Sequence, residues 1–451
     1  MKRLFGTDGI RGMVNEYPMT PELIQKLGKA IALFCIQEND NKDNHPLHVV
    51  IGRDTRISGQ MLESALISGL CSMGIHVYLA GIIPTPAIAL LTRHQKACLG
   101  IVISASHNPY HDNGIKLFQS NGYKLSEDKE AVIEQFVFDN SEQKTKNDPG
   151  LVFTLDNAEQ IYLEFLIQAF YCQRKNFHVI MDCSNGAMFR VAPKLYQHLG
   201  FHSETLHVTP NGKNINLFCG SEYPEELAKK VVETHADVGF AFDGDGDRMI
   251  AIDEKGNIIT GDQILSVCSW FAKKNGKLNN NTVVSTVMSN AGLTAFLTDL
   301  EINHVKSQIG DRHVLETMLS YGATIGGEDS GHMIFLDTHT TGDGLLSSLR
   351  LLDVLSESSE PLSSFTKKMS VFPQVLMNVE VTQKIELSSI PEINQLIEDI
   401  KAKLGSKGRI LLRYSGTQPL CRVMVEGPTQ EETHQYCKRI ADTIKNAIGV
   451  A

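Results

Sequence analysis

GIVISASHNPYHDNGIKLF, residues 100–118, joins a β-branched run to a polar turn. Residues 101–103 predict a buried strand, and the Asn108-Pro109 pair is a turn signal that ends it. In open α/β sheets, ligands bind at the carboxyl ends of the strands. The hydroxyl of Ser106 is therefore a candidate nucleophile, although an ordinary turn can contain the same Ser-His pair.

The length and composition are those of a globular protein with several domains. The 451 residues exceed the size of one domain, which is roughly 100–200 residues. The net charge of -10 argues against a nucleic-acid or acidic-membrane partner, but it permits a small anionic substrate. The nine cysteines have no C-x-x-C spacing, and no apolar run reaches the ~18 residues of a membrane span, so we expect a cytoplasmic protein. A homodimer is compatible with the sequence, which leaves the oligomeric state open.

Three segments share one pattern: a β-branched run, then small, polar and glycine residues, then a stretch with helical periodicity. They begin at His48, His178 and Thr282, and each predicts a strand, a loop and a helix. From Phe372 the order changes to strand, helix, strand, strand and helix, which predicts a smaller α+β domain. We therefore expect an α/β protein of four domains, at residues 1–155, 156–257, 258–371 and 372–451.

The stretch VGFAFDGDGDRMIAIDEKG, residues 238–256, is the candidate metal site. Asp243, Asp245 and Asp247 occupy alternate positions, and in an extended segment alternate side chains point the same way. Gly244 and Gly246 leave room between them. Three close carboxylates repel one another unless a cation neutralises them, so the pattern predicts Mg²⁺.

Other interpretations of the aspartates remain open. An EF-hand loop needs glycine where this chain has Arg248, and helices where it predicts strands. A phosphoaspartate enzyme of the haloacid dehalogenase type also carries two aspartates after a strand, but it has Thr or Val at the place of Asp247. A solvated acidic turn is the third interpretation, and the apolar strands on both sides weaken it.

Three glycine-rich stretches contain groups that suit a phosphorylated sugar. FGTDGIRG, residues 5–12, carries Arg11, and GGEDSGH, residues 326–332, carries acceptors and donors that suit sugar hydroxyls. LRYSGTQPLCRVMVEG, residues 412–427, has a turn with hydroxyl and guanidinium groups that suits a phosphate: Arg413, Ser415, Gly416, Thr417 and Arg422. Each stretch alone also fits an ordinary turn, and a lone histidine is more often part of a core.

Taken in chain order, these motifs and TGDG closely resemble the α-D-phosphohexomutase superfamily over the whole chain. The resemblance implies three related α/β domains with mixed sheets and a smaller C-terminal α+β domain, around a central cleft. It extends to the bacterial branch of isomerases that interconvert glucosamine 6-phosphate and glucosamine 1-phosphate for amino-sugar nucleotide and cell-wall precursor synthesis. The branch that acts on mannose and glucose phosphates stays an alternative, as does a phosphoaspartate phosphatase.

The resemblance also implies a role for each candidate residue. Ser106 would become the phosphoserine, with Ser104 as the less favoured neighbour, and a sugar bisphosphate would be the activator or intermediate. The implied catalytic residues are Ser106, Lys116 as general acid/base, Arg11, His107 and Arg248. One Mg²⁺ per chain would be bound by Ser106, Asp243, Asp245 and Asp247. The sugar would contact Glu328, Ser330 and His332, and its distal phosphate would contact Arg413, Ser415, Gly416, Thr417 and Arg422.

The chain departs from the pattern of the amino-sugar branch at three positions. Asp329 stands where that branch usually has Gln, Gln418 where it usually has Glu, and His313 where Tyr is common. None of these positions belongs to the implied phosphoserine or metal site. An acidic residue beside a cationic 2-amino group is electrostatically favourable, so Asp329 is compatible with an amino-sugar substrate.

Overall fold

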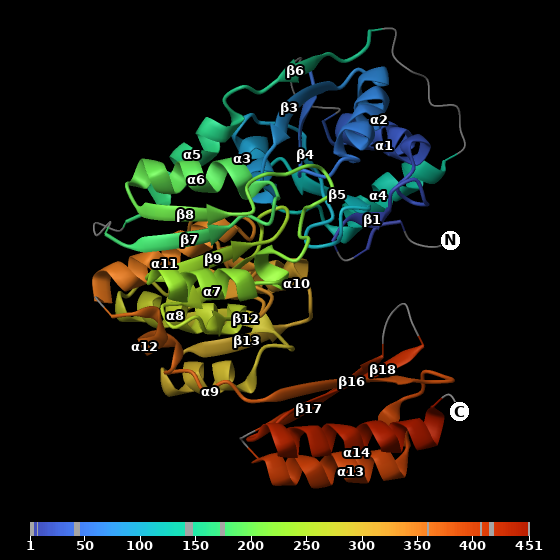
Figure 1. The fold of residues 1–451 in the computed structure, drawn as a ribbon. Helices are drawn as coiled ribbons and strands as arrows, with labels where there is room; N and C mark the ends of the chain where they lie inside the picture. The colour runs from blue at the N-terminus through green and yellow to red at the C-terminus, as the bar shows by residue number, and fades with distance from the viewer. Residues whose placement is uncertain are drawn as a thin grey trace. The chain divides into compact units, whose positions relative to one another are not determined.

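The structure is a computed structural model that describes residues 4–6, 8–39, 46–139, 148–171, 176–358, 360–405, 408–414 and 419–449 (Figure 1). The chain forms two compact units. The first comprises Met1–Met288 and Ile302–Lys367, and the second comprises Ser289–Glu301 and Lys368–Ala451. Among the described helices, none combines the length and the apolar character needed to cross a bilayer.

The first sheet of the first unit has the strand order β1-β5-β4-β2-β3-β6. Its strands are β1 (Ile10–Met13), β2 (His48–Arg53), β3 (His76–Ile82), β4 (Leu99–Ile103), β5 (Asp112–Gln119) and β6 (Val152–Thr154). β5 runs antiparallel to both of its neighbours, while β2, β3, β4 and β6 are parallel, so the sheet is mixed. Every residue of β4 is buried, as its unbroken apolar run predicts.

Four helices accompany this sheet: α1 (Pro21–Asn39), α2 (Gly59–Ser72), α3 (Thr85–His94) and α4 (Glu127–Phe138). α1 and α2 lie side by side (Figure 1) and approach closely at two glycines. A Cβ atom on Gly69 would lie 2.2 Å from the carbonyl oxygen of Gln25, and one on Gly28 would lie 2.5 Å from that of Leu66. Glycine is therefore needed at the crossing of these helices.

The second sheet has the order β11-β10-β9-β7-β8 and is also mixed, because β10 is antiparallel to β9 and β11. Its strands are β7 (His178–Asp182), β8 (His202–Leu206), β9 (Val238–Phe242), β10 (Met249–Asp253) and β11 (Ile258–Ile259). The helical elements of this part are α5 (Ala158–Ala169), α6 (Met188–Leu199), η1 (Gly220–Glu222) and α7 (Glu225–Thr234).

The third sheet has the order β13-β12-β14-β15, with only the β14–β15 pair antiparallel. Its strands are β12 (Thr282–Thr286), β13 (Asn303–Ser307), β14 (Ile325–Gly327) and β15 (Met333–Phe335). The helical elements here are α8 (Gly261–Lys274), η2 (Asn279–Asn281), α10 (Asp311–Tyr321), α11 (Gly344–Ser358) and α12 (Leu362–Thr366). In each of the three sheets, a fully buried strand leads into a polar loop: β4, β9 and β14.

The second unit contains an antiparallel sheet of order β16-β18-β17. Its elements are β16 (Gln374–Glu380), η3 (Leu387–Ser389), α13 (Pro391–Leu404), β17 (Arg409–Tyr414), β18 (Leu420–Glu426) and α14 (Gln430–Ile448). Its core includes Val423, Ile440 and Ile444. This order of elements is the one predicted from Phe372 onward, and it confirms the smaller α+β domain.

The three predicted strand–loop–helix units are present, as β2 with α2, β7 with α6, and β12 with α9 (Ala291–Asp299). However, α9 belongs to the second unit, where the backbone N–H of Ala291 donates to Glu426 Oε2 at 2.9 Å. The fold class is confirmed as three α/β parts with mixed sheets and one smaller α+β part. The domain boundaries predicted from the sequence stay predictions.

Candidate active site

We call residues 104–109, which follow β4, the serine loop. Ser106 in this loop is 1% exposed and has a φ of 54°, a left-handed conformation uncommon outside glycine. Its Oγ donates a hydrogen bond to Asp243 Oδ2 at 2.6 Å and lies 3.4 Å from His107 Nδ1. The fold therefore brings the predicted nucleophile to a predicted metal ligand.

The neighbouring serine, Ser104, supports the backbone of the same loop. Its buried Oγ donates to Asp54 Oδ2 at 2.5 Å and accepts the N–H of Ser106 at 3.0 Å. Its single O–H is therefore committed to Asp54, whereas that of Ser106 is directed at Asp243. This arrangement favours Ser106 as the phosphorylated residue, an assignment that stays a prediction.

We call residues 243–247 the aspartate loop. The expectation that Asp243, Asp245 and Asp247 align along an extended segment is wrong, because the loop is a turn between the antiparallel strands β9 and β10. Gly246 has a φ of 73°, and its N–H donates to the carbonyl of Asp243 at 3.1 Å, so the chain reverses here. The turn still places one oxygen of each aspartate within 4.8 Å of the others.

The aspartate loop has the properties of a site for a hard divalent cation. Asp245 Oδ1 and Asp247 Oδ1 are buried and have no hydrogen-bond partner among the described residues. Burial, together with repulsion from Asp247 and Asp245, raises the pKa of Asp243 well above its ordinary value. A cation bound by these oxygens would satisfy them and remove the repulsion, so the residues fit Mg²⁺.

Lys116, in β5, is buried against the aspartate loop. Its Nζ lies 2.9 Å from Asp245 Oδ2, 3.1 Å from Asp247 Oδ2 and 3.3 Å from Asp8 Oδ2. Burial disfavours the charged amine, but these carboxylates outweigh burial and raise the pKa of Lys116 well above its ordinary value. The predicted general acid/base is thus held as an ammonium group beside the predicted metal ligands.

Two of the predicted catalytic residues are arginines with unused donors. Arg11 forms an ion pair with Asp8, and the Nε of Arg248 lies 4.0 Å from Asp247 Oδ1. Burial opposes the charge of both arginines, yet nearby carboxylates raise the pKa of each above its ordinary value. In both, Nε is buried without a hydrogen-bond partner among the described residues. These fixed cations suit an anionic ligand such as a phosphate.

A pocket of about 590 Å³ lies in the first unit and gathers residues from the predicted sites. Its volume is in the range of small-molecule sites, roughly 300–1,000 Å³. Residues of three predicted roles line it: Arg11, Asp247, Arg248, Glu328, Ser330 and His332. The catalytic, metal and sugar predictions therefore meet at one cavity.

The loop after β14, residues 328–332, presents polar groups to this pocket. Glu328 Oε1 accepts the N–H of Gly310 at 3.0 Å. His332 is 2% exposed, and neither ring nitrogen has a hydrogen-bond partner among the described residues, so it is not a satisfied core histidine. Asp329 instead uses Oδ1 to accept the N–H of Asp262 at 3.2 Å, at the start of α8.

The predicted phosphate loop lies in the second unit and is described only in part. Arg413 and Arg422 are paired across β17 and β18, and burial together with the charge of Arg422 lowers the pKa of Arg413. Ser415, Gly416 and Thr417 fall outside the described residues, as does Gln418. The role of this loop stays a prediction.

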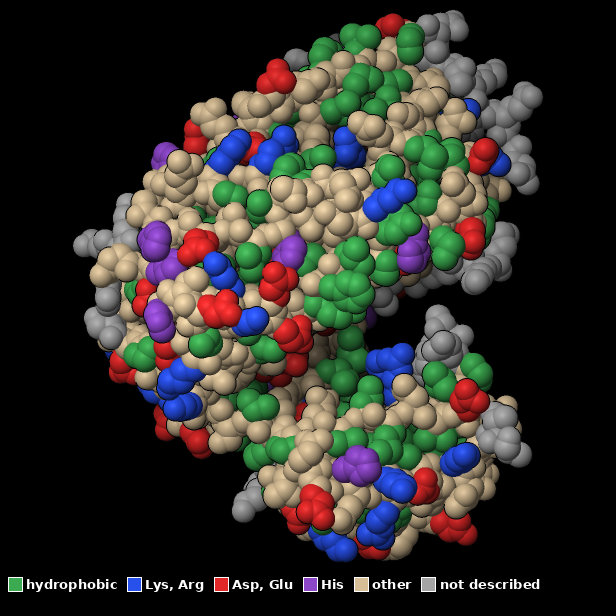
Figure 2. All heavy atoms as spheres, viewed as in Figure 1, with side chains coloured by type: hydrophobic (Ala, Val, Ile, Leu, Met, Phe, Trp, Pro, Cys, Tyr) green, Lys and Arg blue, Asp and Glu red, His purple; other side chains and the backbone are tan. Residues whose placement is uncertain are grey.

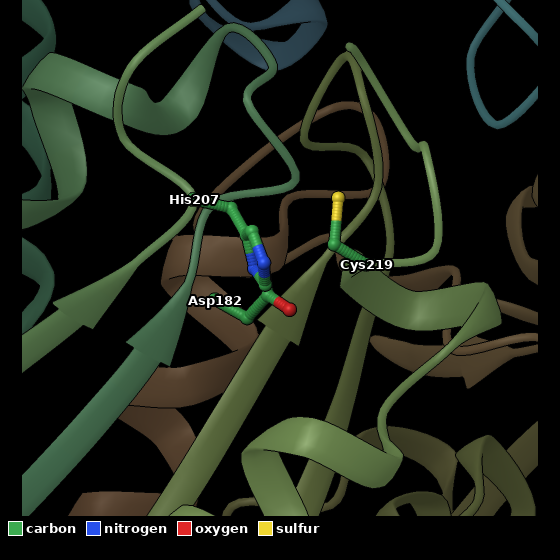
Figure 3. Close-up of side chains that lie close together, drawn as sticks. All are labelled: Asp182, His207 and Cys219. Atoms are coloured by element: carbon green, nitrogen blue, oxygen red, sulfur yellow. The ribbon is translucent and has the colours of Figure 1, made fainter.

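A second cluster of polar side chains lies outside the predicted site. In Figure 3 the ring of His207 lies against the carboxylate of Asp182, and the sulfur of Cys219 lies within 4.8 Å of one atom of each. His207 Nδ1 is 3.0 Å from Asp182 Oδ1, and this pairing raises the pKa of His207. The other oxygen of Asp182 accepts the N–H of Gly220 at 2.8 Å, and burial raises the pKa of Cys219 to about 12. An ion pair beside a core thiol accounts for this group.

Sequence reasoning missed four charged residues near the site. Lys124 contacts both Asp8 and Asp311, and Arg56 contacts the serine loop. The signal for them was weak, since charged residues in polar loops are usually solvated. On the face drawn in Figure 2, basic and acidic side chains are interspersed, so that face offers no extended basic surface.

Comparisons with known proteins cover the whole chain. Four models of the phosphoglucomutase/phosphomannomutase family match in order: alpha/beta/alpha domain I at residues 2–144, domain II at 160–256, domain III at 260–372 and the C-terminal domain at 376–443. The phosphoglucosamine mutase of Syntrophus aciditrophicus is 50% identical, and that of Syntrophobacter fumaroxidans is 48% identical, each over 100% of both chains. The crystal structure of a phosphoglucomutase/phosphomannomutase family protein from Burkholderia thailandensis superposes with a TM-score of 0.80 at 22% identity, over 100% of both chains.

Proposed function

This chain belongs to the phosphoglucomutase/phosphomannomutase family, and we propose that it is a phosphoglucosamine mutase that acts through a phosphoserine at Ser106. As such it is an isomerase that interconverts glucosamine 6-phosphate and glucosamine 1-phosphate. Full-length relatives at 48–50% identity carry that name and support the substrate. The observation that carries the mechanism is the 2.6 Å hydrogen bond from Ser106 Oγ to Asp243, beside a lysine and two arginines.

In the first half-reaction, phosphorylated Ser106 gives its phosphoryl group to the free hydroxyl of the sugar monophosphate. The bond between phosphorus and Ser106 Oγ breaks, and a bond between phosphorus and the sugar oxygen forms. Lys116, held as an ammonium group, is the group that we propose to give one proton to Ser106 Oγ, and the neutral amine that results takes the proton that leaves the sugar hydroxyl. The products are a sugar bisphosphate and unmodified Ser106.

In the second half-reaction, the sugar bisphosphate presents its other phosphate to Ser106. The same bonds form and break in reverse, so that Ser106 is phosphorylated again and the isomeric monophosphate leaves. Phosphoryl transfer depends mainly on positioning and on neutralising charge, which Arg11 and Arg248 supply from fixed positions. A bound Mg²⁺, held by Ser106 and the three aspartates, would supply further positive charge beside the phosphoryl group.

The first experiment distinguishes a phosphoserine at Ser106 from a phosphoaspartate at Asp243. Intact-mass measurement and peptide mapping should place one phosphate on Ser106, and that phosphate should survive hydroxylamine, which cleaves an acyl phosphate. Ser106→Ala should abolish turnover, because no other group stores the phosphoryl between the half-reactions. Phosphate on Asp243, released by hydroxylamine, would overturn the proposal.

Ser104→Ala is the matched control, because Ser104 supports the serine loop without facing the aspartate loop. The substitution removes a partner from Asp54 and from the N–H of Ser106, so it should lower the free energy of unfolding by about 1–3 kcal/mol. Phosphate should still be found on Ser106.

Initial rates with purified glucosamine, glucose and mannose phosphates then test the substrate. A preference for mannose or glucose phosphate would reject the amino-sugar branch and leave the proposed mechanism unchanged.

A further inference from the structure

Arg56 is a fully buried arginine for which the proposed mechanism has no use. It lies three residues after the end of β2, and its side chain has no exposed surface. Its guanidinium reaches the carbonyl oxygens of the serine loop, which follows the neighbouring strand β4. A buried cation beside a phosphorylated serine invites two explanations: it binds the phosphate, or it holds the loop.

The hydrogen bonds decide between these explanations. A guanidinium has five N–H donors. Nε donates to Asp54 Oδ2 at 2.8 Å. Nη1 donates to the carbonyls of Pro109 and, at 3.1 Å, of Asp112, and Nη2 donates to those of Ser106 at 2.9 Å and of Asn108 at 2.7 Å. All five donors are in use, so none is left for a phosphate.

The serine loop has a conformation that needs such support. Ser106 is in the left-handed region, with a φ of 54°, and such a conformation persists only where the surroundings fix it. Its carbonyl and that of Asn108 would be costly to bury without donors. Asn216 Nδ2 is a second donor to both, at 2.8 and 3.2 Å.

The same carbonyl lies against the aspartate loop. A Cβ atom on Gly244 would lie 2.7 Å from the carbonyl oxygen of Ser106 and 2.7 Å from Asn216 Nδ2. The position of Ser106 relative to Asp243 therefore depends on where this carbonyl is held. Arg56 contacts it from the loop after β2, and Asn216 contacts it from the segment between β8 and η1.

We propose that Arg56 is a positioning residue for the reaction: it fixes the Ser106 backbone so that the side chain faces the aspartate loop, and it does not bind the phosphate. This inference rests on the proposed function, because it presumes that Ser106 carries the phosphoryl group. Arg56 should then affect the rate of phosphoryl transfer and leave the binding of the sugar phosphate largely unchanged.

The experiment compares Arg56→Lys with Arg53→Lys, the same change three residues earlier. Arg53 pairs with Glu63 through an Nε–Oε2 contact of 3.4 Å. Lysine has three donors for the five acceptors around Arg56. Because a displacement of about 1 Å at a reacting group costs about 100-fold in rate, we expect kcat of Arg56→Lys to fall by about 100-fold, with KM within threefold of the wild type. Arg53→Lys should keep kcat within threefold.

The direct readout is the rate at which glucose 1,6-bisphosphate phosphorylates Ser106. The reaction is quenched at set times, and intact-mass measurement gives the phosphorylated fraction. The rate is divided by the fraction of folded protein, which circular dichroism gives. A merely structural role would lower the melting temperature without changing this rate per folded site. If Arg56→Lys does not fold, Asn216→Ala removes one donor from the same carbonyls and should slow phosphorylation by about tenfold, an order-of-magnitude expectation for losing one of two donors.

Three results are decisive. The inference is supported if Arg56→Lys or Asn216→Ala shows slower phosphorylation and a lower kcat at unchanged KM, and Arg53→Lys does not. Equal rates in wild type and both variants overturn it, as does a raised KM at unchanged kcat, which would make Arg56 a substrate ligand. A wild-type protein that takes no phosphate on Ser106 instead rejects the proposed function, and the inference with it.

Discussion

Glu328→Gln should reduce the preference for amino sugars without disturbing the loop that carries Glu328. In the structure, Glu328 Oε1 accepts the N–H of Gly310 at 3.0 Å, and in the described part of the chain Oε2 makes no hydrogen bond. A glutamine can keep the bond to Gly310 through its side-chain carbonyl. The substitution therefore removes one negative charge from the pocket and little else.

The expected fall in kcat/KM for the amino sugar follows from the hydrogen bond that Glu328→Gln weakens. A hydrogen bond between Glu328 and a protonated 2-amino group is charge-assisted and contributes roughly 1.5–3 kcal/mol, which corresponds to about 10- to 150-fold in specificity. We expect kcat/KM for glucosamine 6-phosphate to fall by this factor in Glu328→Gln. The value for glucose 6-phosphate, which carries a neutral hydroxyl at that position, should stay within about threefold.

Asp329→Asn is the matched control on the next residue. Asp329 is exposed, lines the same pocket and uses Oδ1 to accept the N–H of Asp262 at the start of α8. The assay is initial rates with both sugar phosphates for the wild type and the two variants. An unchanged ratio of the two kcat/KM values in Glu328→Gln would refute the reasoning. If this ratio falls equally in Asp329→Asn, the preference comes from the overall negative charge of the pocket and not from contact with Glu328.

Three further outcomes test the metal site, an ion pair and the response to acid. Chelation should abolish turnover and Mg²⁺ should restore it, whereas Ca²⁺ should occupy the aspartate loop with little turnover; full activity at zero metal content would contradict this. Glu130→Gln breaks a buried two-point ion pair with Arg312, at 3.0 and 2.6 Å, and should lower the unfolding free energy in urea by about 3–5 kcal/mol; a loss below about 1 kcal/mol would contradict the expectation. His339 accepts the N–H of Thr340 at Nδ1, and its Nε2 lies 3.0 Å from the carbonyl oxygen of Pro86. Burial lowers the pKa of His339 to about 4, so between about pH 6.5 and 4 the histidine is protonated in the unfolded chain and neutral in the folded chain. Stability should therefore fall by up to about 3 kcal/mol as the pH drops from about 6.5 to 4, and melting curves of the wild type and His339→Gln should show a smaller fall in the variant.

The strands that precede the active-site loops were predictable from the sequence alone. β4 and β9 are short runs of buried apolar residues, and hydrophobic pattern is a property of near neighbours in the chain. The polar residues that follow them, Ser106 and the three aspartates, were recognised because a carboxyl edge of a sheet is where such groups can meet a ligand. Local order along the chain was sufficient for these inferences.

Only the tertiary structure decided how these groups meet. The hydrogen bond between Ser106 and Asp243 spans 137 residues, and it depends on how two sheets pack. The aspartates converge through a turn at Gly246, not through an extended strand, because the antiparallel β10 begins just after the loop and forces the chain to reverse. Pattern along the sequence cannot distinguish these two backbones, since both place carboxylates at alternate positions.

Arg56 and the Glu328–Asp329 pair show the same difference between what the sequence predicts and what only the fold decides. From the sequence, Arg56 is one more charged residue in a polar loop, and only its burial with five acceptors indicates that it holds the serine loop. Glu328 and Asp329 are adjacent acids, and the sequence made the first a sugar contact and the second compatible with an amino sugar. In the fold both residues line the pocket, but Glu328 accepts the N–H of Gly310 and Asp329 accepts the N–H of Asp262, because the direction of a side chain depends on the neighbouring elements against which its loop packs.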